Sequence, residues 1–307
     1  MTIAEQKAAC ETYQGMTEIP TDFEAVWRGR WAKAAPAGEV LVERLPFQNA
    51  QAAYQQWSVP APNGREIRAR YIRPAREGAF PTVLMFHDLG RGVRGWHHMT
   101  RFVALGYAVA ALENQTSVAD WRRDWAALSL EDRYLDALTL AHAAIGLSST
   151  DPARLMTWGE GFGGGLAIVA ASLVPGVIRC AALNPLPGDL RAMCDGAVGT
   201  DRAVLDGLDP VSFAALLTCP LLLGTGLLDQ TASPKCQYAI FNRARGPKTH
   251  LVYPKYEHER INFFENEQFS KRLFNAIHQY KEECVKTGNA EETDGNNYCI
   301  SKEQKEK

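Results

Sequence analysis

The sequence predicts an α/β fold in which a mostly parallel central sheet carries antiparallel strands at its N-terminal end and helices on both faces. From Pro81 onward, apolar strand patterns alternate with helix patterns, which is typical of parallel strands joined by right-handed crossovers. Before Pro81, three β-rich runs follow one another with only turn signals between them, which favours antiparallel pairing. With 307 residues, 46% of them hydrophobic, the chain is long enough to bury the core of one such domain.

A short helix and three strands are expected ahead of the parallel part. Apolar residues recur at helical spacing after Thr21, a residue type that caps helix N-termini, so this helix should pack its apolar face on the domain. Its apolar residues are Phe23, Val26, Trp27 and Trp31. The expected elements are a helix over 22–35 and strands over 40–48, 53–60 and 66–73.

The parallel part predicts six strands with helices between most of them. The strands are expected over residues 82–86, 108–112, 154–158, 178–184, 221–225 and 250–253. The helices are expected over residues 96–105, 130–145, 164–174, 234–244 and 263–283.

The domain organisation predicted from composition is a leader over residues 1–20, one domain over residues 21–284 and a tail over residues 285–307. The tail is rich in Lys, Glu, Asn and Asp and almost free of apolar residues, so we expect it to be disordered. Within the domain, residues 186–217 are rich in Gly and Asp and interrupt the alternation. A stretch at this position, after the carboxyl end of a strand, is expected to form a lid or a pocket wall.

Charge and composition exclude several classes of partner. A formal net charge of -2 and a pI of about 6.4 give no field that would attract nucleic acid. No apolar run approaches the roughly 20 residues that cross a bilayer, and residues 1–16 lack a secretory signal, so we expect a cytoplasmic protein without a membrane partner. The seven cysteines are scattered and odd in number, which favours reduced thiols and gives no metal or cofactor site.

The most informative segment is a strand, a sharp glycine turn and a helix over residues 154–168. Hydrolases use such a turn as a nucleophile elbow, in which small residues flank a central nucleophile and the helix N-terminus faces the developing oxyanion. Gly159 and Gly163 supply the small positions here, so the nucleophile position falls on Gly161.

Two other interpretations of this turn stay open. Gly159, Gly161 and Gly164 also fit the Gly-x-Gly-x-x-Gly pattern of a dinucleotide-binding turn. That pattern expects an acidic residue about 20 positions on, where this chain has Asn184 and Pro185. The glycines would also simply allow close packing of the helix on the strand.

Several motifs in the same order resemble the carbohydrate esterase family of acetyl xylan esterases and cephalosporin C deacetylases, which have an α/β-hydrolase fold. The likeness spans roughly residues 20 to 280. It rests on Asp22-Phe23-x-x-x-Trp27, Phe86-His87-Asp88-Leu89-Gly90 for the family's His-Gly-Tyr-Gly loop, Gly159-Glu160-Gly161-Phe162-Gly163-Gly164 for its Gly-x-Ser-Gln-Gly-Gly elbow, Gly226-Leu227-Leu228-Asp229 for its Gly-Leu-Met-Asp segment, and Tyr253-Pro254 followed by His258-Glu259.

The resemblance implies a serine esterase mechanism with residues in named positions. A serine attacks an acetyl ester, His258 removes its proton, Asp229 orients His258, and the backbone N–H groups of Leu89 and Phe162 hold the oxyanion. The departures from the family pattern are Gly161 for Ser, Phe162 for Gln, Leu89 for Tyr, and Glu113-Asn114-Gln115 for an Arg-Gly-Gln-Gly loop.

Gly161 has no side chain to act as a nucleophile, so the usual covalent route is excluded. Ser148, Ser149, Ser172 and Ser233 lie outside the elbow, and Asp88, Asp132 and Asp136 are expected to serve loops and helix surfaces. We therefore predict a catalytically silent family member that binds an acetylated sugar or another small ester, or that serves as an assembly partner. The resemblance also implies a homo-oligomer, because members of the family assemble as symmetric oligomers. The alternatives are an active ester hydrolase that uses activated water or a non-standard nucleophile, and a nucleotide-binding protein.

Overall fold

The computed structural model describes residues 3–90, 93, 95–113, 129–194, 201–258 and 269–275. The chain divides into two compact units, Met1–Asn266 and Glu267–Lys307. In the second unit, residues 269–275 are helical. The predicted tail over residues 285–307 and most of the helix predicted over 263–283 lie outside the described residues.

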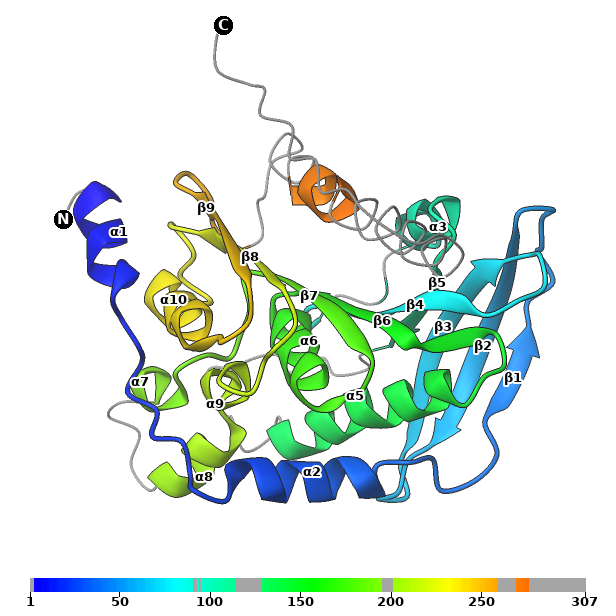
Figure 1. Ribbon diagram of the computed structural model, residues 1–307, viewed down its shortest axis with the longest axis horizontal. Helices are drawn as coiled ribbons and strands as arrows, with labels where there is room; N and C mark the ends of the chain where they lie inside the picture. Colours follow the sequence, from blue (N-terminus) through cyan, green and yellow to red (C-terminus); the bar gives the residue numbers. More distant parts are fainter. Residues whose placement is uncertain are drawn as a thin grey trace, which may run out of the picture. The chain divides into compact units, whose positions relative to one another are not determined.

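The first unit is built on one mixed sheet that confirms the predicted fold class (Figure 1). Its strands, as far as the chain is described, are ordered β1-β2-β3-β5-β4-β6-β7-β8-β9. The strands are β1 (Leu41–Arg44), β2 (Ala52–Pro60), β3 (Glu66–Pro74), β4 (Phe80–Phe86), β5 (Ala108–Leu112), β6 (Thr150–Glu160), β7 (Val177–Leu183), β8 (Leu221–Gly226) and β9 (Lys248–Tyr253).

The strand directions agree with those predicted from the order of strand and helix patterns along the sequence. The pairs β1·β2, β2·β3 and β3·β5 are antiparallel, and every pair from β5·β4 to β8·β9 is parallel. The carboxyl ends of β4, β6 and β8 therefore meet at one edge of the sheet, which is where ligand sites form in such folds.

Helices cover both faces of the sheet. In Figure 1, α3 lies on one face and α5, α6 and α10 lie on the other. The helices are α1 (Ile3–Glu11), α2 (Phe23–Lys33), α3 (His97–Ala104), α5 (Leu130–Ile145), α6 (Phe162–Leu173), α7 (Leu190–Met193), α8 (Arg202–Leu208), α9 (Pro210–Ala214) and α10 (Pro234–Arg243). In the described residues, no helix is long and apolar enough to span a membrane.

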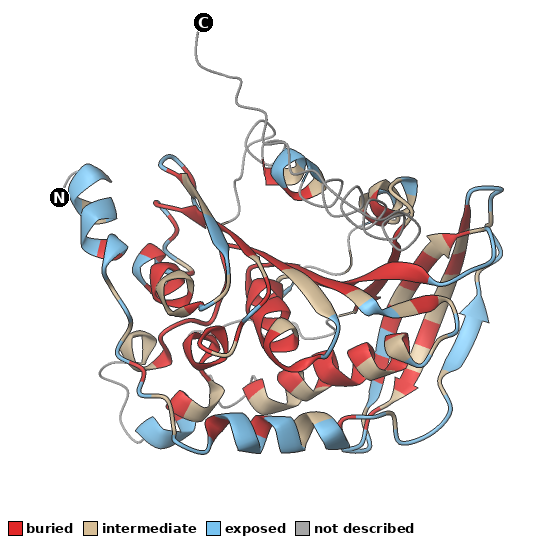
Figure 2. Cartoon of the chain, in the orientation of Figure 1, coloured by how far each residue is buried: buried red, intermediate tan, exposed pale blue. Residues whose placement is uncertain are grey.

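The core lies between the sheet and these helices. Central strands such as β4, β5 and β8 are buried along their whole length, whereas all four residues of the edge strand β1 are exposed (Figure 2). An aromatic cluster fastens α2 to α5 and α9: the ring of Trp27 lies 4.8 Å from that of Phe213 and 5.8 Å from that of Tyr134. The helix thus packs through Phe23 and Trp27, whereas Val26 is exposed, and the N-cap residue is Asp22 rather than the predicted Thr21.

The predicted insertion and leader contain helices that the sequence analysis did not place. Residues 186–217 hold α7, α8 and α9, with residues 195–200 outside the described range, and α9 packs against α6 and α10. The leader holds α1, and its residues Tyr13, Met16 and Thr17 bond to the buried carboxyl groups of Asp189 and Asp209. The leader is therefore tied to the segment predicted as a lid.

Candidate active site

The glycine turn has the backbone of an elbow. Gly161 separates the last residue of β6 from the first of α6, with φ 55° and ψ -127°. L-amino acids rarely adopt this conformation, because Cβ then crowds the backbone. The turn is fixed by backbone bonds from Gly161 N to Leu183 O (2.9 Å) and from Leu186 N to Gly161 O (3.0 Å).

The flanking positions must be small because the backbone is crowded on both sides of the turn. A Cβ on Gly159 would lie 2.7 Å from Gly164 N, and one on Gly163 would lie 2.7 Å from His87 N. Distances this short are not found for real Cβ atoms, so helix α6 sits against β6 and β4 at a separation that only glycine permits. The elbow interpretation and the close-packing interpretation therefore describe the same geometry.

The structure brings His258 and Asp229 together at the edge where β8 and β9 end. His258 Nδ1 lies 2.7 Å from Asp229 Oδ2. The Asp229 side chain is fully buried and that of His258 is 7% exposed. This contact has the geometry in which a carboxylate orients an imidazole.

Asp229 is itself held by its surroundings. Its Oδ1 accepts hydrogen bonds from the backbone N–H groups of Thr231 and Ala232, each at 2.8 Å, and its Oδ2 accepts one from Gln237 Nε2 at 3.2 Å. One oxygen thus caps the turn before α10 while the other faces His258. The side chain of Asp229 is therefore fixed in its position beside His258.

Asn184 does not play the part that a dinucleotide site requires. In that alternative an acidic residue after β7 would face a ribose. Instead, Asn184 Oδ1 accepts a hydrogen bond from Gly226 N at 2.8 Å and ties the end of β7 to the loop that carries Asp229.

The sequence expectation for Asp88 is wrong. Asp132 and Asp136 lie on α5 and pair with Arg65; Asp132 lies at the helix surface as expected, whereas Asp136 is buried, so the surface role predicted for it is wrong. Asp88, however, follows β4 into the candidate site, and its Oδ2 lies 3.1 Å from His258 Nε2. A sequence signal was present: Asp88 stands where the family's His-Gly-Tyr-Gly loop has its first glycine.

The two backbone amides predicted to form the oxyanion hole converge on one atom of this side chain. Leu89 N donates to Asp88 Oδ1 at 2.9 Å and Phe162 N donates to the same oxygen at 2.8 Å. A Cβ placed on Gly161 would overlap Asp88, with Oδ2 only 2.6 Å away. The carboxyl group of Asp88 therefore fills the space that a side chain at residue 161 would need.

The electrostatics of the pair of carboxyl groups control His258. Burial alone lowers the pKa of His258, but the hydrogen bonds to Asp229 and Asp88 and the charges of both carboxylates outweigh it and raise the pKa to about 9. His258 is therefore an imidazolium at neutral pH, and each of its ring nitrogens donates to a carboxylate. In this state the ring has no lone pair with which to accept a proton.

Both ring nitrogens of His258 lie within hydrogen-bonding distance of carboxylates, those of Asp229 and Asp88, and not of a hydroxyl or thiol group of the described residues. Ser172 donates to Ile168 O and lies within α6. Glu113, which follows β5, forms an ion pair with Arg70, with 2.8 Å between Arg70 Nε and Glu113 Oε1. Asn114 and Gln115, which follow it in the motif, lie outside the described residues.

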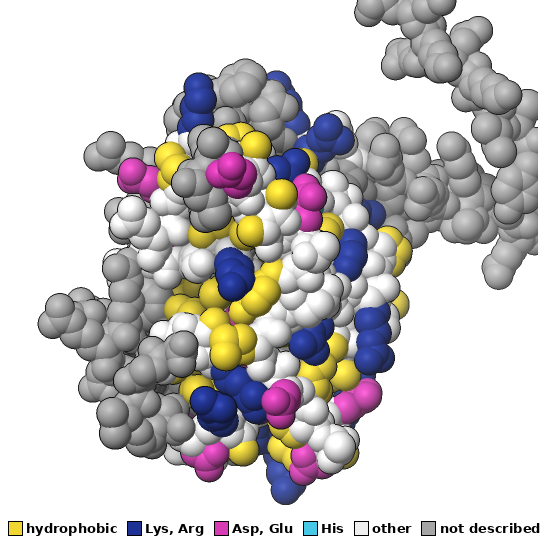
Figure 3. All heavy atoms as spheres, turned by 90° about the vertical axis from the view of Figure 1, so that its left-hand side faces the viewer, with side chains coloured by type: hydrophobic (Ala, Val, Ile, Leu, Met, Phe, Trp, Pro, Cys, Tyr) yellow, Lys and Arg dark blue, Asp and Glu magenta, His cyan; other side chains and the backbone are white. Residues whose placement is uncertain are grey.

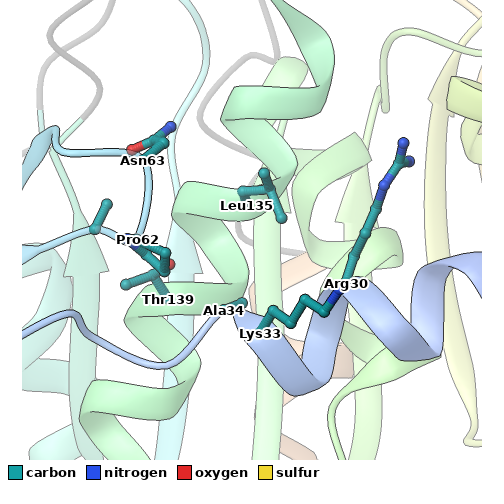
Figure 4. Close-up of a pocket in the computed structure, with 8 residues that line it drawn as sticks. Arg30, Lys33, Ala34, Pro62, Asn63, Leu135 and Thr139 are labelled. Carbon is teal, nitrogen blue, oxygen red and sulfur yellow. The ribbon is translucent and has the colours of Figure 1, made fainter.

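Other surfaces of the first unit are separate from this site. A cavity of about 280 Å³ between α2, α5 and the β2–β3 turn is walled by Ala34, Pro62 and Leu135, with Arg30 and Lys33 at its rim (Figure 4). None of its lining residues belongs to the candidate site. On the face in Figure 3, basic and acidic side chains are interspersed with apolar patches, an arrangement that generates no strong field of one sign.

Comparison with known proteins places the chain in a family. It matches the family described as acetyl xylan esterase (AXE1) over residues 5–121, 122–202 and 193–276. The chain belongs to the acetyl xylan esterase family. An acetyl esterase of Xylanibacter ruminicola, Axe7A, is 22% identical over 81% of this chain, and the chain spans only 65% of the length of that relative.

Solved acetyl xylan esterases share the fold. The enzyme from a Thermoanaerobacterium species superposes with a TM-score of 0.72 at 21% identity and covers 88% of this chain and 97% of its own. The enzyme from a Paenibacillus species gives a TM-score of 0.74 at 19% identity, with 90% and 99% covered. The chain thus has the α/β architecture of these structures.

Proposed function

We propose that this member of the acetyl xylan esterase family does not carry out serine-dependent acyl transfer. The observation that supports this most directly is the position of the Asp88 carboxyl group, which bridges the amides of Leu89 and Phe162 to His258 above Gly161. In this proposal Asp229 and His258 are a retained orienting pair, and Gly161 is a nucleophile position without a nucleophile.

Acyl transfer by the family mechanism has three requirements. It needs a nucleophile, a neutral imidazole that takes the nucleophile's proton, and amide donors that are free to bind the oxyanion. Gly161 supplies no nucleophile. The carboxylates of Asp229 and Asp88 favour the protonated form of His258, and Asp88 Oδ1 occupies the two amide donors. The carboxyl group of Asp88 therefore contributes to two of the three deficiencies.

The test is hydrolysis of a chromogenic acetyl ester by the wild-type chain and by His258→Ala. We expect both proteins to hydrolyse the ester at the same low rate, no faster than an unrelated protein of equal concentration. Wild-type turnover above that background that disappears in His258→Ala would show that the site is catalytic and would reject the proposal.

One observation favours a second candidate, an ester hydrolase that works by an unusual route. Asp88 is a carboxylate in contact with His258, and carboxylates serve as nucleophiles or as bases toward water in other hydrolases. For this route Asp88 has to leave the amides, because they must receive the oxyanion. Turnover that is abolished equally by Asp88→Asn and His258→Ala would establish this candidate.

The family supplies the remaining proposals. A small ester such as an acetylated sugar is the ligand class that the names of the relatives suggest. The cysteines of the described residues are free thiols, which supports a reducing, cytoplasmic location. Self-association into a homo-oligomer is measured by light scattering of the purified chain, and a monomer at all concentrations would reject it.

A further inference from the structure

The side chain of Asp88 has the chemical structure of the acetate ion. It is a carboxylate on one methylene carbon, held to the chain through Cα. Its contacts are those that a free carboxylate would make in an acyl site. Oδ1 lies between two amide donors, at 2.9 Å from Leu89 N and 2.8 Å from Phe162 N, and Oδ2 lies 3.1 Å from His258 Nε2.

The carboxyl group of Asp88 also lies directly beside residue 161. A Cβ built on Gly161 would overlap both Cγ and Oδ1 of Asp88 and lie 2.6 Å from Oδ2. In an acyl-serine, the acyl group likewise lies beside the serine side chain. Asp88 therefore places its carboxyl group in the volume next to residue 161 and its Oδ1 between the two amides.

We propose that Asp88 is a built-in ligand of the acyl site, and that the site, once freed of this side chain, binds small carboxylates of the size of acetate. This inference rests on the proposed function, because it takes the amides of Leu89 and Phe162 as an acyl site. The favourable groups are the two N–H donors, one of them at the N-terminus of the twelve-residue helix α6, and His258.

The tether explains why an external ligand cannot compete in the wild-type chain. An attached group acts at an effective concentration well above millimolar, since its translational freedom is already lost. The Asp88 side chain is only 14% exposed, so it is also shielded by its surroundings. An ester or carboxylate ligand must therefore displace Asp88 before it reaches the amides.

The test is an NMR titration with sodium acetate, observed through the His258 ring signals, at constant ionic strength. Asp88→Gly removes the ligand and its methylene group. We expect this variant to show a saturable shift of the His258 signals and to bind acetate at least tenfold more tightly than the wild-type chain. Sodium chloride at equal concentration is the control for a general salt effect.

The matched control is Asp88→Asn, which has nearly the shape of aspartate. Its side-chain oxygen can accept from the same two amides, so it continues to fill the site without the charge. We expect no acetate binding by Asp88→Asn. Binding by Asp88→Asn or the wild-type chain that equals binding by Asp88→Gly would overturn the proposal, as would a folded Asp88→Gly that does not respond to acetate.

A second variant covers the case in which Asp88→Gly does not fold. Asp88→Ser shortens the side chain and keeps a polar group. We expect this variant to bind acetate as well. A folded Asp88→Ser that does not bind acetate would contradict the proposal. The outcome for the proposed function is separate. Ester hydrolysis by the wild-type chain that depends on His258 would reject the proposed lack of catalytic activity, whereas the acetate titration tests only whether Asp88 occupies a carboxylate-binding site.

Discussion

Residues 161 and 88 share one small volume, and the two residue types are complementary in that volume. Gly161 has no side chain, and the carboxyl group of Asp88 occupies the space that one would need. The positive φ of Gly161 is comfortable for glycine and strained for serine. The amides of Leu89 and Phe162 have an acceptor in Asp88, so neither of these two N–H groups is left unpaired.

Gly161→Ser is expected to destabilise the fold for two reasons. The strained backbone conformation costs about 1–3 kcal/mol, and the new Cβ displaces Asp88 from its hydrogen bonds. Urea denaturation of Gly161→Ser, Asp88→Gly and the double variant measures the coupling. We expect the double variant to be more stable than the sum of the single effects predicts, because only one of the two side chains then needs the space. Simple additivity would contradict the overlap.

His258 should titrate well above an ordinary histidine. Its pKa is raised to about 9, so in Asp88→Asn, which loses one carboxylate, the pKa is expected to fall. NMR titration of the ring signals measures both values. A wild-type pKa near 6.5 would show that the two carboxylates do not act on the ring as described.

The same shift makes His258 a source of stability below neutral pH. A raised folded-state pKa means that the contribution is complete below the unfolded pKa near 6.5 and is lost as the pH rises through 9. A shift of this size corresponds to about 3 kcal/mol. Denaturation of the wild-type chain and His258→Gln at pH 6 and pH 9.5 should give a smaller difference at the higher pH.

At the scale of elements, the contact of α6 with β6 and β4 depends on glycines at positions where the backbone leaves no space for a Cβ atom. Gly163→Ala would force a Cβ against the backbone of Phe86 and His87, and we expect a loss of about 3 kcal/mol or more. The matched control is Gly29→Ala in the exposed helix α2, where a Cβ meets nothing within 4 Å. That change should stabilise the fold by about 0.5–1 kcal/mol. Thermal unfolding of both variants measures the contrast, and equal effects would refute it.

The leader is a second element whose place depends on a few polar contacts. Tyr13 donates its hydroxyl to Asp189, a buried residue, and burial together with this carboxylate raises the pKa of Tyr13. Tyr13→Phe leaves one carboxylate oxygen of Asp189 without this donor, at a cost of about 1.5–3 kcal/mol. Proteolysis within residues 1–19 should become faster in Tyr13→Phe, and an unchanged rate would show that the leader is held by other contacts.

For the whole molecule, the sequence predicted the parts of the fold that follow local periodicity. The helix over 130–145 and the strand over 108–112 have the predicted bounds, because the helix is an amphipathic repeat that ends before Gly146 and the strand is a short apolar run after Gly106. The short helices α7 to α9 were missed because they are fixed by capping and tertiary contacts. Asp209 before Pro210 is an N-cap signal that could have located α9.

The candidate site was predicted in part. Chain order and motif spacing were enough to pair Asp229 with His258 across β9, because both loops leave the same edge of a parallel sheet. Asp88 was placed in a loop role, although it aligns with a glycine of the His-Gly-Tyr-Gly loop to which this segment was compared. That signal does not show where the side chain lies, and the space beside Gly161, 73 residues later, becomes visible only when the backbone positions are known.

The folding stability of the whole molecule is expected to decrease in acid, because protonation of His250 disturbs the contact between β8 and β9. His250 bonds to Thr225 at 2.9 Å and stacks on Phe241, and burial, with a smaller effect of Lys7, lowers its pKa to about 4. A lowered pKa means that the folded state binds fewer protons, so stability is complete above pH 6.5 and falls as the pH drops through 4.

The variant His250→Phe keeps a ring beside Phe241 and cannot be protonated. When the pH falls from 7 to 4, the free energy of unfolding of the wild-type chain should decrease by about 3 kcal/mol relative to that of His250→Phe. Guanidinium denaturation at the two pH values measures it. A difference that does not depend on pH would mean that His250 is not neutral in the fold.

The shared volume of residues 88 and 161 also bears on how such a protein can change over generations. A change to serine at 161 alone meets the Asp88 side chain and a strained backbone, and loss of the aspartate alone leaves two inward-facing amides without an acceptor. Either single step is disfavoured, so substitutions at the two positions are expected to be tolerated only when they occur together.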